Sequence, residues 1–308
     1  MSTELTGIIF RQSVTMALYM AMGYLLFRRG KITAEGSKSI AALLLWLVLP
    51  GVIINSFCVE FTPERLEQLG VSALLGAGAL LLAMALARLI YGKSPVDNFA
   101  AAFSNAGFMG IPLVKACFGE SAVFYLVAFV AFLNVMQWVY GIALLSRGKA
   151  QAGWKQLLFN PICAGLAVGL LLFFTGLGTR LPGIIRNTVS GIAALNGPLA
   201  MLVLGVYLAQ TNPIAMLTKP GLYILSAVLL LLIPAATMLL LSPIPADTTL
   251  RLTILAAACA PVGSNVAVYA QLYGEDYPYA CQMVAMSTLL STLTMPAVLS
   301  VGSWLFNR

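Results

Sequence analysis

The stretch FSNAGFMGIPLV, from Phe103 to Val114, decides how this chain folds, because it interrupts a long apolar segment. It places an asparagine, two glycines and a proline where a membrane-spanning helix normally carries leucine. Proline removes a backbone donor and clashes with the preceding turn, whereas glycine permits the conformations that follow a break. Backbone groups in lipid must be hydrogen-bonded internally, so a non-helical stretch persists there only inside protein or beside a water-filled cavity. We therefore predict a broken membrane helix that borders a polar site.

The composition of the whole chain is that of a membrane protein. Of its 308 residues, 60% are hydrophobic, only 9% are charged and none is histidine, whereas a soluble domain carries about a quarter charged residues. The net charge of +7 comes from bases scattered at segment ends, as membrane topology requires, so it does not indicate a nucleic-acid partner. The amino terminus lacks a small-residue cleavage site, and we expect no secretory signal peptide. We expect one all-α polytopic membrane domain over residues 1–308.

The reactive side chains do not suggest an enzyme. The five cysteines show no CxxC spacing, and without histidine the usual zinc and haem sites are improbable. All ten acids lie near a segment end or in a loop. Because catalysis and proton transfer inside a membrane usually need a midplane carboxylate or histidine, we expect no catalytic residues, no cofactor and no proton coupling through a buried acid.

Hydrophobic segments recur along the chain, and a spanning helix needs roughly 20 apolar residues. We expect ten spans, at residues 7–27, 36–58, 69–91, 97–118, 121–145, 156–176, 183–209, 220–241, 248–273 and 278–305. The longest connection, Arg147 to Lys155, divides the chain into two halves, residues 1–146 and 156–308.

The two halves share features at a nearly constant separation of about 150 residues. Segment 2 is predicted to break around Pro50 and segment 7 around Pro198, and FGES at 118–121 corresponds to YGED at 273–276. Since five spans end on the opposite side of the membrane, the second repeat must be inverted relative to the first. Inverted repeats are an architecture of transporters, in which the substrate site lies near the midplane between the repeats.

The distribution of lysine and arginine predicts the orientation. The loops between segments 1–2, 3–4, 5–6, 7–8 and 9–10 hold ten of the 17 basic residues. Because basic loops remain in the cytoplasm, we place these loops there and both termini in the periplasm.

Segment 9 contains a second break that matches the one in segment 4. It reads APVGSN from Ala260 to Asn265, with proline, glycine and asparagine again in mid-segment. The second half of a broken helix starts with free N–H groups and about half a positive charge, so two such starts form an anion site. Asn105 and Asn265 can add donors to a carboxylate, and the oxygens of Ser104, Asn105, Ser264 and Asn265 are the candidate ligands for a sodium ion. The alternative is that both breaks only kink their helices.

These motifs closely resemble those of the auxin efflux carrier family, which includes the PIN-type plant exporters. NAGFMGIPLVKACFGE resembles the fourth-helix motif, and APVGSNVAVYAQLYGED resembles the ninth-helix motif of bacterial members. The stretches GYLLFRRGKI, LVLPGVIINSF, NPICAGLAVGLLL and GPLAMLVLG read like segments 1, 2, 6 and 7, so the similarity spans nearly the whole chain. The short central loop departs from the plant exporters and agrees with the bacterial members.

The resemblance implies two inverted five-helix repeats in which helices 4 and 9 cross at the substrate site. It also implies a scaffold and a mobile transport domain, a homodimer in a bacterial inner membrane, and elevator-type movement of small organic anions such as carboxylates. The candidate substrate-binding residues are Asn105, Gly107, Gly110, Pro112, Pro261, Gly263, Ser264, Asn265 and Asn55. Two alternatives stay open: a sodium-coupled importer resembling the bile-acid symporters, and a membrane sensor that binds the ligand without transporting it.

Other polar side chains within the spans have less specific expectations. Asn55 either faces the site or is satisfied by packing. Lys115 is expected to snorkel to the lipid headgroups. Asn134 and Gln137 share a helix face and are expected to join helices by hydrogen bonds, and Asn196 to cap the break in segment 7.

Overall fold

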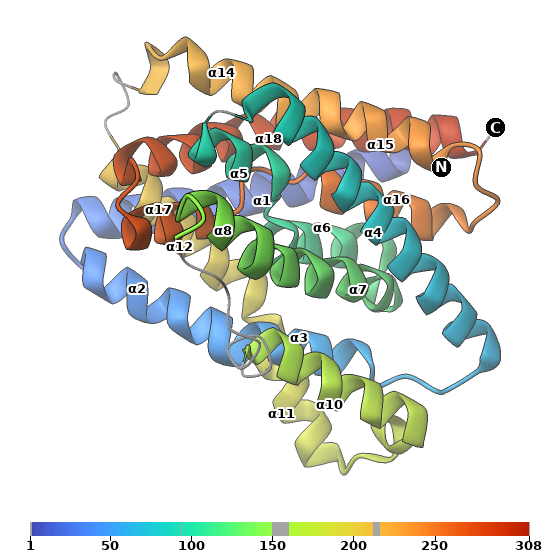
Figure 1. Cartoon of the computed structure of the whole chain (residues 1–308). Helices are drawn as coiled ribbons and strands as arrows, with labels where there is room; N and C mark the ends of the chain where they lie inside the picture. The colour runs from blue at the N-terminus through green and yellow to red at the C-terminus, as the bar shows by residue number, and fades with distance from the viewer. Residues whose placement is uncertain (1, 93, 150–159, 212–215, 308) are drawn as a thin grey trace.

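The computed structural model describes residues 2–92, 94–149, 160–211 and 216–307, and this part of the chain is helical apart from one isolated β-bridge (Figure 1). Six helices in it are long and apolar enough to cross a membrane: Ala34–Ser56, Pro63–Tyr91, Glu120–Leu145, Gly183–Gln210, Pro220–Leu241 and Tyr277–Phe306. The architecture is therefore that of an all-helical polytopic membrane protein, as predicted. Residues 150–155 of the predicted central loop, with Lys155, lie outside the described residues.

The helices have the following bounds: α1 (Ser2–Arg28), α2 (Ala34–Leu43), α3 (Leu49–Ser56), α4 (Pro63–Tyr91), α5 (Pro95–Ala102), α6 (Ile111–Phe118), α7 (Glu120–Met136), α8 (Ile142–Leu145), α10 (Pro161–Thr175), α11 (Gly183–Ala194), α12 (Asn196–Gln210), α14 (Pro220–Ala227), α15 (Ile233–Leu241), α16 (Thr248–Ala258), α17 (Asn265–Tyr273) and α18 (Tyr277–Phe306). π-Helical turns at Leu44–Val48, Gln137–Gly141 and Val228–Leu232 connect neighbouring helices into longer rods.

Short sequence signals set the helix ends. Side-chain oxygens accept a backbone N–H from the first turn and so satisfy one of the donors that every helix start leaves free; the capping residues are Thr33, Thr62, Asn160, Asp247 and Asp276. Gly119 and Gly274 end α6 and α17 with φ of 83° and 73°, values that favour glycine. These are the glycines of FGES and YGED, so both matched motifs place a glycine of positive φ at the helix end, although ψ is 178° at Gly119 and 23° at Gly274.

We divide the helices into two groups, which are not separate bodies, because α1 packs along α18 and also contacts α6, and α3 contacts α7. The first helix group comprises α1–α3 and α10–α12, in which α1 lies along α12 and α3 contacts both α10 and α11. The second helix group comprises α4–α8 and α14–α18, in which α4 contacts α5 and α7, and α18 contacts α14, α16 and α17. In Figure 1, α10 and α11 lie with α3 at the lower end of the view, and α14 and α15 lie at the opposite end. The boundary between the groups runs through the interior of the molecule.

The predicted break of segment 2 at Pro50 is wrong. The helix runs from Ala34 to Ser56, and Pro50 lies in the first turn of α3, directly after the π-helical turn Leu44–Val48. A wider turn leaves room for a ring that would clash with an ordinary preceding turn. In segment 7 the interruption lies at Leu195, between α11 and α12, rather than at Pro198 itself.

Glycines allow α1 and α12 to approach each other closely. A Cβ at Gly205 of α12 would lie 2.0 Å from the carbonyl oxygen of Met20, and a Cβ at Gly23 of α1 would lie 2.1 Å from that of Leu202. Small residues at helix interfaces allow this backbone contact in membranes. The pair α1–α12 is therefore a close-packed element of the first helix group.

We expect Gly205→Ala to destabilise the fold by about 1–3 kcal/mol, because the added methyl group forces α1 and α12 apart. Gly191→Ala is the matched control: nothing lies within 4 Å of a Cβ there, so the substitution should be neutral or slightly stabilising. Thermal unfolding of the detergent-solubilised protein measures both effects. Equal melting temperatures for the two variants would contradict the close packing.

Candidate functional site

Segments 4 and 9 are both interrupted in the middle. In segment 4, α5 ends at Ala102, the chain is extended at Phe103, and a π-helical turn, Ala106–Gly110, leads into α6. In segment 9, α16 ends at Ala258 and α17 begins only at Asn265. The break of segment 9 contains the predicted Pro261 and Gly263. The break of segment 4 is shorter than predicted and lies at Phe103–Asn105, because Gly107 and Gly110 belong to the π-helical turn and Pro112 to the first turn of α6.

The two interruptions pair with each other. The backbone N–H of Asn105 donates to the carbonyl oxygen of Pro261 at 2.7 Å, and that of Gly263 donates to the carbonyl of Phe103 at 2.9 Å. These bonds form an antiparallel bridge at Ser104 and Val262. Each break thus supplies partners for backbone groups that the other break would leave unpaired inside the membrane.

Side chains hold this crossing in place. The Ser104 hydroxyl donates to the carbonyl of Ala257 at 2.7 Å, and the Ser287 hydroxyl of α18 accepts from the backbone N–H of Val262 at 3.0 Å. A Cβ at Gly263 would lie 3.0 Å from the carbonyl oxygen of Phe103, so the close approach favours glycine. The crossing is a rigid unit joined to α16 and α18.

Asn105 keeps a free donor at the crossing. Its Oδ1 accepts from the backbone N–H of Phe108 at 3.4 Å, while its Nδ2 is buried and has no partner among the described residues. The whole residue is 5% exposed. A buried donor without a partner costs about 1–3 kcal/mol, so this amide is suited to a ligand that brings an acceptor.

A cavity of about 510 Å³ extends from the crossing between the two helix groups. Its walls come from α2 and α12 of the first group and from α7, α17 and the start of α18 in the second. The polar side chains in its lining include Lys38, Asn134, Tyr207, Gln210, Ser264 and Asn265. Lys38 forms an ion pair with Glu35 at 2.8 Å. The cavity ends near the loops that we predict to be cytoplasmic.

The candidate residues separate into three sets. Ser264 and Asn265 line the cavity. The residues within or next to the interruptions are Asn105, Gly107, Gly110, Pro112, Pro261 and Gly263. Asn55 lies elsewhere, in a small pocket with Lys115 and Glu120. Lys115, which was expected to snorkel to the lipid headgroups, pairs with Glu120 at 2.7 Å.

The polar residues of the neighbouring spans have distinct roles. Gln137 joins helices as expected, since its Oε1 accepts from Asn265 Nδ2 at 2.8 Å. Asn134 donates to the carbonyl of Val130 at 2.7 Å in its own helix and also lines the cavity. The expectation that Asn196 caps its helix is wrong, because α12 starts without a side-chain cap. Its Nδ2 instead donates to the carbonyl of Gly107 at 2.9 Å, across the boundary between the two helix groups.

Sequence reasoning did not identify the aromatic part of the lining, which includes Phe108, Trp138, Tyr207 and Tyr269. Aromatic residues are common throughout membrane helices, so no sequence signal distinguished these four. For the proposed sodium ligands, the structure gives oxygens only from neutral groups. No cluster of three or more cysteines or acids that could hold a metal ion occurs in the described part of the chain.

Comparison with known proteins decides the family. Residues 8–299 match the family described as membrane transport protein. The chain belongs to this family. The resemblance to the auxin efflux carriers, which are part of it, is confirmed, and the protein is a membrane transporter rather than an enzyme.

Two curated relatives are transporters by name. A putative malonate transporter of Rhizobium meliloti (strain 1021) is 25% identical over 304 residues, which cover 90% of this chain and 91% of that protein. An uncharacterized transporter of Methanothermobacter thermautotrophicus is 25% identical over 209 residues, which cover 63% of this chain and 66% of that protein.

We expect Ser287→Ala to destabilise the protein by about 1–3 kcal/mol, because the buried N–H of Val262 loses its acceptor. Thr292→Ala on the same helix is the matched control, since that hydroxyl donates only to the carbonyl of Leu289 within α18. Thermal unfolding in detergent compares the two. A loss no larger for Ser287→Ala than for Thr292→Ala would contradict the role of Ser287 at the crossing.

Proposed function

We propose that the protein is a secondary transporter of small organic anions, with the substrate held where interrupted segments 4 and 9 cross. The observation that carries this proposal is the hydrogen-bonded crossing at one end of a 510 Å³ cavity between the helix groups. We further propose ten spans in two inverted five-helix repeats, and a homodimer in a bacterial inner membrane with both termini periplasmic.

The electrostatics of the crossing favour an anion. The π-helical turn before α6 begins after Asn105, and α17 begins at Asn265 without a side-chain cap. Helix starts carry partial positive charge and free N–H groups, and the unpaired Nδ2 of Asn105 adds a donor. Among the described residues of the lining, Lys38 is the one that carries a full charge, so the site suits a small carboxylate rather than a highly charged anion.

The substrate class follows from this chemistry together with the relatives. One relative is named as a putative malonate transporter, and malonate presents two carboxylates to donors of the kind found at the crossing. The cavity is large enough for such an anion. We therefore propose small mono- and dicarboxylates as substrates.

The division into two helix groups supports an elevator-type mechanism. Both interrupted segments belong to the second group, whereas α2 and α12, on the opposite wall of the cavity, belong to the first. Movement of the second group along the first would carry the crossing from one face of the membrane to the other, as alternating access requires.

Asn105→Ala and Asn265→Ala should each reduce transport at least about tenfold, because each removes an amide next to the substrate site. The protein should still fold, since Asn105→Ala loses only the long bond from the Phe108 N–H and Asn265→Ala loses one bond to Gln137. Initial uptake rates into proteoliposomes, normalised to folded protein, measure the effect. Asn187→Ala, which removes an exposed asparagine of α11 outside the cavity lining, is the matched control. Undiminished uptake in both asparagine variants would reject the crossing as the substrate site.

Flux of labelled malonate, malate and indole-3-acetate into proteoliposomes, with and without a sodium gradient, tests the function itself. We expect sodium-independent flux, because the acids lie at segment ends and the crossing offers only neutral oxygens. Flux that rises with sodium would favour the sodium-coupled importer and a sodium site near Ser104, Asn105, Ser264 and Asn265. Binding without flux of any of the three would favour the sensor.

A further inference from the structure

A second, much smaller pocket lies at the other end of the segment 2 helix. It has a volume of about 20 Å³, room for about one water molecule. The large cavity touches the beginning of this helix, from Ala34 to Trp46, whereas the small pocket touches Val52, Asn55 and Ser56 near its end. From Lys38 to Asn55 the helix rises about 25 Å. The molecule is therefore open on one face and closed on the opposite face.

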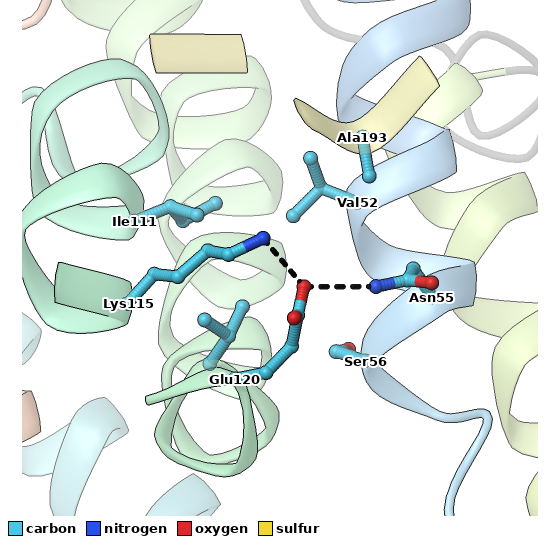
Figure 2. Close-up of a pocket in the computed structure, with 8 residues that line it drawn as sticks. Val52, Asn55, Ser56, Ile111, Lys115, Glu120 and Ala193 are labelled. Atoms are coloured by element: carbon cyan, nitrogen blue, oxygen red, sulfur yellow. Dashed lines mark hydrogen bonds and ion pairs between the residues drawn. The ribbon is translucent and has the colours of Figure 1, made fainter. Parts of the chain in front are cut away.

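Two donors meet on one carboxylate oxygen in the small pocket (Figure 2). Lys115 Nζ lies 2.7 Å and Asn55 Nδ2 lies 3.2 Å from Oε1 of Glu120. The three side chains come from α6, α3 and α7, and they point toward one another in the close-up. An ammonium and an amide that converge on a carboxylate form a binding site for carboxylates, here filled by a carboxylate of the chain itself.

This contact crosses the boundary between the helix groups. Asn55 belongs to the first helix group, and Lys115 and Glu120 belong to the second. The sequence counterpart of Glu120 in the other repeat is Glu275, which binds Arg147 with Nε–Oε1 at 2.8 Å within the second group. That hydrogen bond raises the pKa of Arg147. The matched glutamates thus make different contacts: the one at the closed face joins the groups, and the one at the open face does not.

The ion pair is exposed enough to be exchanged. The side chains of Lys115 and Glu120 are 44% and 53% exposed, and pairs exposed to this degree are weak. A carboxylate arriving from solution can therefore compete with Glu120 for the same two donors.

We propose that Lys115 and Asn55 form a carboxylate-binding site at the closed face, and that Glu120 occupies this site while the face is closed. The inference rests on the proposed function, because the ligand is the same class of small carboxylate that the crossing would carry. When the second helix group moves, Glu120 and Lys115 move together away from Asn55, and the exposed Lys115 then exchanges Glu120 for a substrate carboxylate at this entrance.

Thiol labelling of Ser56→Cys tests the closure without measuring transport. Ser56 lines the small pocket and is 3% exposed, so a cysteine there reacts with a maleimide only when the face opens. The five native cysteines are replaced, and the protein is studied in nanodiscs so that both faces meet the reagent. We expect Glu120→Ala to accelerate labelling at least about threefold.

Matched variants distinguish loss of the Glu120 contact from a general destabilisation of the helix packing. Glu275→Ala removes the corresponding glutamate at the other face and should leave labelling of Ser56→Cys unchanged. Glu120→Gln retains the size and an acceptor for Asn55 but loses the ion pair, so it gives a smaller acceleration and covers the case in which Glu120→Ala does not fold. Unchanged labelling in folded Glu120→Ala or Glu120→Gln would overturn the proposal, as would equal acceleration by Glu275→Ala.

The binding site itself is tested with acetate and malonate as probes. In Glu120→Ala, millimolar acetate or malonate should slow labelling of Ser56→Cys, and chloride at equal ionic strength should not. Adding Lys115→Met should remove this protection, because the ammonium is lost. Faster labelling with no protection by either probe, or protection that survives Lys115→Met, would overturn the assignment of a carboxylate site. Because labelling requires no flux, a protein that transports none of the substrates tested can still support this inference.

Discussion

Backbone hydrogen bonding inside the membrane is the constraint on which the rest of this structure depends. An interrupted helix exposes N–H and C=O groups that lipid cannot satisfy, and this chain interrupts two helices. The bonds from Asn105 to Pro261 and from Gly263 to Phe103 let each interruption satisfy the other. Segments 4 and 9 therefore cross at this point, and the residues that follow the crossing in α17 form one wall of the cavity.

Much of the fold was predictable because it depends on local chemistry. Proline, glycine and asparagine in mid-segment indicated which two segments are interrupted, although in segment 4 only Asn105 of these residues lies in the interruption itself. The bridge at Ser104 and Val262 was not predictable, because residues so distant in sequence meet only through packing. Pro50 shows that a proline alone does not locate a break. A proline lies in the interruption of segment 9, whereas Pro50 follows a π-helical turn and its helix continues.

The candidate site likewise contains residues that the sequence located and residues that it did not. Ser264 and Asn265 line the cavity because they begin α17 at the crossing, a position that the sequence motif already indicated. Asn55 was placed by its distance from a break that does not exist, and it lies near the far end of its helix instead. Aromatic residues of the cavity wall come from segments 4, 5, 7 and 9, and the sequence does not show which face of each helix their rings occupy. Side-chain direction relative to a cavity requires the packing of several helices.

The unequal contacts of Glu120 and Glu275 connect sequence repetition with mechanism. FGES and YGED are alike in sequence, and both place a glycine of positive φ directly before the acidic residues. Lys115 stands five residues before Glu120, whereas Ala270 holds the corresponding position before Glu275, so the second motif lacks the lysine and its glutamate pairs with Arg147 instead. The two motifs therefore keep the glycine but differ in the charged partner, and only the first joins the two helix groups. If the proposed inverted repeats exchange their environments during transport, the contact of Glu120 with Asn55 has to break when its face opens, whereas the contact of Glu275 lies within one group and persists.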